Sequence, residues 1–206
     1  MTRTPPRLVL MCGLPGAGKT TMARQLETEI PALRLCPDEW LADLGISLYN
    51  EVMRERLEAM FWQLAQRVLQ LGQSVILENG FWGRAERDAK RIGAQALGAR
   101  VVLHFLDVPL DELWRRIEIR NGEDRWRTAP ITLAQLEEWA GLFQAPDAAE
   151  MALFDAPDEL LALDRDGHRV PVLGGEDEDG IIRDRLATAN VRVDGPSFMA
   201  ELMKRA

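Results

Sequence analysis

The sequence has only two cysteines, Cys12 and Cys36, among its 206 residues, which excludes a disulfide framework and a zinc-binding cysteine pattern. We expect both to be buried thiols of a protein in a reducing compartment. No apolar run approaches the roughly 20 residues of a membrane span, and residues 1–7 lack the features of a secretory signal. These absences predict a cytoplasmic protein with no membrane partner.

Basic residues are outnumbered, with 25 Lys and Arg against 33 Asp and Glu, which gives a formal net charge of −8. Nucleic acids and anionic membranes need a basic face, so this balance argues against a nucleic-acid partner and leaves room only for a local basic groove. Hydrophobic residues make up 47% and charged residues 28%, as in an ordinary globular protein. The length fits one compact α/β domain, and we expect a single domain over residues 1–206.

Short apolar runs alternate with longer segments of helical periodicity. The expected strands are Arg7–Cys12, Leu33–Cys36, Ser74–Glu78 and Arg100–Leu106. The expected helices are Lys19–Ile30, about Ser47–Leu71, Arg84–Leu97, Pro109–Arg120 and Thr132–Phe143. This alternation predicts βαβ units and a parallel sheet with helices on both faces. A polar connector, Asn121–Pro130, follows the fourth helix.

The last 60 residues are less regular. Asn190–Asp194 fits a fifth strand and Pro196–Arg205 a closing helix. Before them, Leu160–Asp164 and Arg169–Leu173 flank a polar turn and suggest a hairpin. We interpret Pro157–Gly180 as an insertion that breaks the alternation.

Residues 13–20, GLPGAGKT, fit the phosphate-loop pattern G-x-x-x-x-G-K-[ST] at every fixed position, between an expected strand and an expected helix. The glycines let the backbone N–H groups point at phosphate oxygens, and the helix N-terminus adds positive charge. Lys19 would reach the β- and γ-phosphates of ATP, and the Thr20 hydroxyl would bind Mg²⁺. The nucleotide-binding residues expected here are Gly13, Pro15, Gly16, Ala17, Gly18, Lys19, Thr20 and Thr21. The alternative is a glycine turn with an exposed lysine.

Asp38 follows the second expected strand, at the edge of a parallel sheet where ligands bind. Its carboxylate could accept the proton of an attacking hydroxyl or help to hold Mg²⁺. The alternative is that Asp38 caps the helix that begins after Pro37. Glu39 is the weaker candidate for the same roles.

Glu78 closes the third expected strand, which is the position of the carboxylate that assists magnesium binding in phosphate-loop proteins. Asn79 could contact the substrate. Phe81 and Trp82 could form the wall of a substrate pocket or could belong to the core.

Two groups of arginines complete the candidate site. Arg84, Arg87 and Arg91 share a face near the N-terminus of their helix, where the helix dipole disfavours cations. One explanation for these arginines is that they bind an anionic part of the substrate. The other is that they form a solvated basic face. Arg116 and Arg120 lie four residues apart before the polar connector. They could bring charge to a transferring phosphoryl group, or simply satisfy the C-terminal end of their helix.

The chain resembles small P-loop kinases, in particular the group that contains polynucleotide kinase phosphotransfer domains, zeta-toxin-like kinases and chloramphenicol phosphotransferase. The resemblance depends on GLPGAGKTT (13–21), Asp38-Glu39-Trp40, VILENGFWGRAERD (75–88), RRIEIRN (115–121) and residues 131–150. It implies a three-layer αβα P-loop NTPase fold, with a five-stranded parallel sheet in the order 2-3-1-4-5 and a lid at about 121–130. It also implies Asp38 as the base, Arg116 against adenine and Arg120 at the phosphates. Glu78 departs from the aspartate of many relatives.

The leading hypothesis is therefore an ATP- and Mg²⁺-dependent kinase acting on a hydroxyl group of a small molecule. In this hypothesis Lys19, Asp38 and Arg120 are catalytic, Thr20 and Glu78 hold the metal, and Asp38, Asn79, Phe81, Trp82, Arg84 and Arg87 contact the substrate. The alternatives are a nucleic-acid 5′-hydroxyl kinase and a nucleotide-binding ATPase without an acceptor. The sequence has no N-K-x-D motif of a guanine-nucleotide switch.

Overall fold

The computed structural model describes residues 4–122, 130–157, 161–163 and 169–171. The elements of the first part are β1 (Arg7–Cys12), α1 (Lys19–Glu29), β2 (Ala32–Leu35), α2 (Pro37–Asp43), α3 (Glu51–Gln70), β3 (Ser74–Gly80), α4 (Arg84–Gln95), β4 (Arg100–Phe105), α5 (Leu110–Asn121), α6 (Leu133–Leu142) and α7 (Ala148–Met151). The predicted strands and long helices are therefore confirmed, with ends that differ by a few residues. The short helices α2 and α7 were not among the predicted elements.

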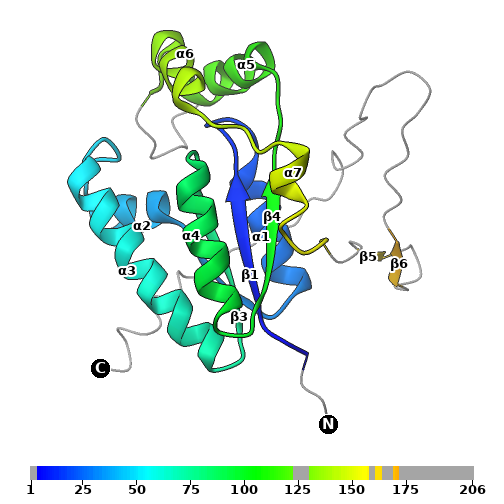
Figure 1. The fold of residues 1–206 in the computed structure, drawn as a ribbon. Coiled ribbons are helices and arrows are strands. Elements are labelled where there is room, and N and C mark those ends of the chain that lie inside the picture. Colours follow the sequence, from blue (N-terminus) through cyan, green and yellow to red (C-terminus); the bar gives the residue numbers. More distant parts are fainter. Residues whose placement is uncertain (1–3, 123–129, 158–160, 164–168, 172–206) are drawn as a thin grey trace. The chain divides into compact units, whose positions relative to one another are not determined.

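The four strands form a parallel sheet in the order β2-β3-β1-β4. Leu8 of the central strand β1 pairs with Val75 on one side and with Val101 on the other. Helices α3 and α4 lie on one face of this sheet and α1 lies behind it (Figure 1). This arrangement confirms the predicted three-layer αβα fold and the 2-3-1-4 part of the predicted strand order.

The central strand is apolar on both faces because both faces are covered by helices. Leu8, Val9, Leu10 and Met11 are each no more than 2% exposed. A continuous apolar run of this kind is typical of a parallel strand between two helical layers. All four strands run in one direction, so their carboxyl ends meet at the same edge of the sheet and bring the polar residues that follow them together.

The two cysteines are confirmed as buried thiols. Burial raises the pKa of Cys12 to about 11 and that of Cys36 to about 12. Cys12, at the end of β1, donates a hydrogen bond from Sγ to the carbonyl oxygen of Phe81 (3.4 Å). Both thiols therefore stay protonated at neutral pH.

The chain separates into two compact units, residues 1–158 and 159–206. In the second unit, β5 (Leu161–Leu163) pairs antiparallel with β6 (Arg169–Pro171), which confirms the two strands of the predicted hairpin. The expected fifth strand at 190–194, the closing helix at 196–205 and most of the expected insertion at 157–180 lie outside the described residues. Among the described helices, none has the length and apolar character needed to cross a membrane.

Candidate active site

The phosphate loop connects β1 to α1 with a backbone that only glycine adopts readily. Gly16 and Gly18 have positive φ angles of 85° and 96°, and Gly18 is the N-cap of α1. A Cβ atom at Gly16 would lie 3.1 Å from the carbonyl oxygen of Leu113. The N–H of Gly13 donates to the carbonyl oxygen of Gly80 (3.0 Å), which ties the loop to the end of β3. The loop thus has the tight curvature that a phosphate cradle needs.

The Lys19 ammonium group bends back over this loop. Its Nζ donates hydrogen bonds to the carbonyl oxygens of Gly13 and Leu14, both at 2.9 Å. Burial lowers the pKa of Lys19 to about 8, against the opposing effect of the Asp38 and Glu78 carboxylates. A bound phosphate would add negative charge and raise this pKa again.

The lowered pKa of Lys19 predicts a pH-dependent affinity for ATP–Mg²⁺. Below pH 8 the lysine already carries the charge that attracts phosphate, whereas above pH 8 the free protein must first take up a proton. We expect the Kd to rise about tenfold between pH 7 and pH 9, since one pKa unit corresponds to a tenfold change. Calorimetric titration with ATP–Mg²⁺ in two buffers of different ionisation enthalpy would measure both the affinity and the proton uptake.

The matched control for this titration is Lys19→Arg, because a guanidinium group stays charged over the whole range. If the variant binds ATP–Mg²⁺, its Kd should not change between pH 7 and pH 9. A wild-type affinity that is constant over this range, with no proton uptake, would contradict the assignment of Lys19.

A cavity of about 800 Å³ opens at the carboxyl edge of the sheet, next to the phosphate loop. The predicted site residues that line it are Pro15, Gly16, Gly18, Lys19, Thr20, Thr21, Asp38, Glu78, Asn79, Trp82, Arg116 and Arg120. The structure therefore brings together residues from four separate segments of the sequence. The predicted residues that do not line the cavity are Gly13, Ala17, Phe81, Arg84 and Arg87.

Asp38 lies in the first turn of α2, where the side chain is 53% exposed. The N-cap position belongs to Cys36, so Asp38 does not fill the role of capping residue that was the alternative explanation. Its Oδ1 accepts a hydrogen bond from Nη2 of Arg54 (2.6 Å) on α3. An exposed carboxylate on the cavity wall, held by one arginine, is suited to contact a ligand.

Glu78 has a different environment from Asp38. Its side chain is only 1% exposed and forms an ion pair with Arg34 of β2. Arg34 also pairs with Glu39, which in turn contacts Arg24. Arg34 therefore holds Glu78 in place at the end of β3, while Glu39 faces this arginine pair and does not line the cavity.

Arg116 and Arg120 approach the cavity from α5. Arg116 pairs with Glu112 (Nε to Oε1, 2.7 Å) and remains 44% exposed. The Nε atom of Arg120 is buried and has no hydrogen-bond partner, and burial lowers the pKa of this guanidinium. Arg120 is also within electrostatic range of Asp38. Arg120 is thus a half-buried cation on the cavity wall whose buried Nε can still donate to a ligand.

The ends of the predicted lid are fixed to the rest of the first unit. Asn121 donates from Nδ2 to the carbonyl oxygen of Ile131 (2.7 Å) and accepts from the N–H of the same residue (3.2 Å). The hydroxyl group of Tyr49 donates to the carbonyl oxygen of Pro130 (2.6 Å). Residues 123–129 of the lid lie outside the described residues.

The turn after β3 separates a core residue from a cavity residue. Phe81 is completely buried and has a positive φ of 48°, which is rare for an aromatic residue. The prediction that Phe81 lines a substrate pocket is therefore wrong, because it packs into the core. Trp82 does line the cavity, and its ring lies 5.9 Å from that of Trp139 of α6, between centroids. Asn79 also lines it, with a buried Oδ1 that has no donor.

Arg87 is a structural residue, and its predicted contact with the substrate is wrong. It is completely buried, and its Nε and Nη2 donate to the two carboxylate oxygens of Glu150 (2.6 and 2.9 Å). Its Nη1 donates to the carbonyl oxygen of Phe81 (2.8 Å). This ion pair joins α4 to α7 and leaves no group of Arg87 free for a ligand.

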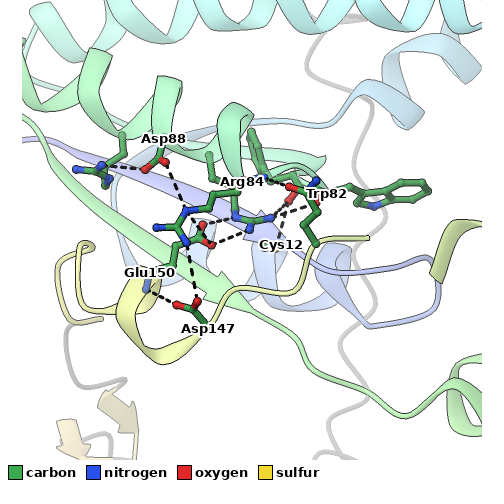
Figure 2. A network of polar contacts seen from close by, with 10 residues as sticks. Cys12, Trp82, Arg84, Asp88, Asp147 and Glu150 are labelled. Atoms are coloured by element: carbon green, nitrogen blue, oxygen red, sulfur yellow. Dashed lines mark hydrogen bonds and ion pairs between the residues drawn. The ribbon is translucent and has the colours of Figure 1, made fainter. Parts of the chain in front are cut away.

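Arg84 also points away from the cavity. Its guanidinium lies between three carboxylates, Asp88, Asp147 and Glu150, at 3.8–4.0 Å (Figure 2). The side chain is 47% exposed. The prediction that Arg84 contacts the substrate is not supported, because these three carboxylates account for its charge.

The buried ion pair predicts a large loss of stability for Arg87→Met. This change leaves the Glu150 carboxylate buried without its cation, which destabilises a protein by about 3–5 kcal/mol. Arg84→Met on the same helix is the matched control and should cost less than about 1 kcal/mol, as exposed ion pairs do. Urea unfolding followed by tryptophan fluorescence would measure both. Equal stability of the two variants would show that the Arg87–Glu150 pair does not hold α7 to α4.

The polar and aromatic residues on the cavity wall that were not predicted from the sequence are Tyr49, Glu51, Arg54, Glu86 and Trp139. Arg34, behind Glu78, was missed as well. Arg54 carried a usable signal, because it is a cation near the N-terminus of α3, where the helix dipole disfavours it. Tyr49 is the single tyrosine of the chain, but its position in a loop gave no indication of its role.

The residues at the cavity fit a magnesium nucleotide. Thr20 lies directly after Lys19, at the start of α1, and supplies a hydroxyl oxygen of the kind that Mg²⁺ prefers. Among the described residues, no group of three or more His, Cys, Asp or Glu side chains is placed to hold a metal ion.

A phosphate loop between β1 and α1, at the edge of a sheet of order 2-3-1-4, defines the P-loop class of proteins. The chain belongs to the AAA domain family, whose model matches residues 8–146. Family and fold together confirm the predicted resemblance to small P-loop kinases. Among curated proteins, none matches this sequence.

Solved structures with the same fold differ widely in sequence. A chain of the Pnkp1/Rnl/Hen1 RNA repair complex is 22% identical, with a TM-score of 0.59. The match covers 82% of the present chain but only 49% of the chain in that complex. Chaetomium thermophilum Kti12 in complex with ADP-AlF3 is 20% identical, with a TM-score of 0.53 over 69% of this chain and 82% of that one. A sugar kinase from Janibacter sp. HTCC2649 is 22% identical, with a TM-score of 0.52 over 71% and 82%.

Proposed function

We propose that this protein is a kinase that uses ATP and Mg²⁺ to phosphorylate a hydroxyl group of a small molecule. One observation carries the proposal. The phosphate loop, the exposed carboxylate of Asp38 and the half-buried cation of Arg120 line a single cavity of about 800 Å³. A volume of this order holds a small ligand.

In the proposed reaction the acceptor oxygen attacks the γ-phosphorus of ATP, and the bond between that phosphorus and the bridging oxygen of ADP breaks. Asp38 takes the proton of the acceptor hydroxyl, since its carboxylate faces the cavity and is held by Arg54. Lys19 and Arg120 place positive charge where the phosphoryl group carries negative charge. Arg116, at the exposed end of the wall, would lie against the adenine.

Thr20 and Glu78 would hold Mg²⁺, which neutralises charge on the β- and γ-phosphates when bound. Thr20 would supply its hydroxyl oxygen. Arg34 fixes the Glu78 carboxylate at the end of β3, so this side chain is positioned before any ligand arrives.

The test is transfer of label from γ-labelled ATP to a panel of sugars, amino sugars, other alcohols, nucleosides and 5′-hydroxyl oligonucleotides. We expect ADP production to depend on an added hydroxyl compound and the label to appear on it. ADP production that no compound accelerates would favour an ATPase instead.

A nucleic-acid 5′-hydroxyl kinase is the second candidate, because a chain of an RNA repair complex shares the fold. Two observations disfavour it. The formal net charge is −8. In addition, carboxylates pair with Arg84 and Arg87, the two predicted substrate-binding cations that could have bound a terminal phosphate. Label on the oligonucleotides alone would support this candidate over the small-molecule kinase.

A further inference from the structure

The charges on the described cavity wall are unevenly distributed between its elements. Helices α1 and α5 contribute cations, Lys19, Arg116 and Arg120. Helices α2, α3 and α4 contribute three carboxylates, Asp38, Glu51 and Glu86, and one cation, Arg54, which is already bound to Asp38. The cations suit the phosphates of ATP, so the acidic part of the wall is left for the acceptor.

Glu86 has no hydrogen bond and no ion pair within 4.0 Å among the residues that the structure describes. It is the third residue of α4 and lines the cavity. Burial raises the pKa of Glu86, and burial together with the charge of Glu86 raises the pKa of Glu58 to about 7. Glu86 therefore lies close enough to Glu58 to disfavour the charge of Glu58, while the charges of Lys90 and Arg87 lower the pKa of Glu86 without forming an ion pair with it.

The nearest lysine does not supply that cation as an ion pair. The ammonium group of Lys90 lies 4.9 Å from the ring centroid of Trp62, and burial lowers its pKa. The guanidinium of Arg87 is used completely by Glu150 and two carbonyl oxygens. Within the part of the chain that the structure describes, the Glu86 carboxylate thus has no ion pair or hydrogen bond, and Lys90 and Arg87 act on it only through their charge.

Aromatic rings also line the cavity. Trp82 precedes α4 by two residues, and its indole is 5.9 Å from that of Trp139. Indole faces attract cations and also cover apolar surface. Close by in the sequence, the buried Oδ1 of Asn79 has no donor, so it can accept a hydrogen bond from a ligand.

We propose that the phosphoryl acceptor carries an ammonium group as well as the reacting hydroxyl, as an amino alcohol or an amino sugar does. The ammonium group would pair with Glu86 and lie against Trp82 and Trp139, while the hydroxyl would point to Asp38. The inference rests on the proposed kinase function and adds the chemical class of its substrate. Asp38, Glu51 and Glu86 would repel an anionic acceptor.

The test measures binding by tryptophan fluorescence, with Mg²⁺ and a non-hydrolysable ATP analogue present, in a buffer without amines. The probes are matched sets: glucosamine with N-acetylglucosamine and gluconate, and 2-amino-1,3-propanediol with glycerol. We expect saturable binding of at least one amine, with an affinity about tenfold or more above that of its neutral partner. Glu86→Gln should abolish this difference. The control Glu55→Gln, on the exposed side of α3, should keep it.

Equal or tighter binding of the neutral or anionic probes would overturn the inference, and so would the absence of saturable binding by both amines. Label transfer from γ-labelled ATP to the same probes tests the kinase activity separately from amine binding. Label on a neutral or anionic alcohol alone would support the kinase function and overturn the inference that the acceptor carries an ammonium group. Amine binding that depends on Glu86, without label on any compound, would support the cation site and count against the kinase.

Discussion

Asp38→Asn is expected to reduce phosphoryl transfer by about 10²–10⁴-fold while the affinity for ATP–Mg²⁺ stays within a few-fold of wild type. The substitution keeps the size of the side chain and removes the charge that would take the proton of the acceptor. Asp38 faces the cavity and is within electrostatic range of both Lys19 and Arg120. Single-turnover transfer and calorimetric binding of ATP–Mg²⁺ would measure the two quantities separately.

The neighbouring carboxylate provides the control for Asp38. Glu39→Gln removes a charge from the same turn of α2, but Glu39 pairs with Arg34 and Arg24 and does not line the cavity. This variant should keep the transfer rate within a few-fold. Normal transfer by Asp38→Asn together with weaker Mg²⁺ binding would make Asp38 a metal ligand, and normal values for both would remove it from the mechanism.

Lys19→Ala should lower turnover by at least about 10²–10³-fold, because it removes a cation preorganised for the transferred phosphoryl group. We expect little change in the melting temperature. The variant loses two hydrogen bonds to loop carbonyls, but it also loses a charge that burial disfavours, as the lowered pKa indicates. Turnover with the acceptor and the melting temperature would be measured on the same preparation.

Arg24→Ala is the matched control for Lys19, since it removes a cation from the exposed face of the same helix. Its turnover should be near that of wild type. A Lys19→Ala variant that turns over ATP at a similar rate to Arg24→Ala would contradict the assignment of residues 13–20 as a catalytic phosphate loop.

The sequence was sufficient to predict most of the first unit, because local patterns determine it. The run Arg7–Cys12 is apolar at nearly every position. This pattern is typical of a strand that helices cover on both faces. The glycines at 16 and 18 need positive φ angles, and the lysine and threonine follow in fixed register. The cavity residues closest to these signals, Lys19, Thr20 and Asp38, were therefore predicted correctly to lie at one edge of the sheet.

The arginines of α4 show where local patterns are insufficient. Their spacing places Arg84 and Arg87 on one helix face, but spacing does not tell whether that face meets solvent, substrate or another helix. Glu150, 63 residues later, decides the role of Arg87 by pairing with it in the core. In the same way, the positive φ of Phe81 turns this ring into the core and leaves Trp82 at the cavity.

What the sequence by itself determined is the P-loop fold and the nucleotide end of the site, since both depend on contiguous residues with strict backbone or chemical requirements. Only the tertiary structure decided the remainder of the site. Arg54, Glu86 and Trp139 come from three different helices and reach one cavity through packing. Contacts between distant segments depend on side-chain volumes and ion pairs across the whole core, and no local period in the sequence encodes them.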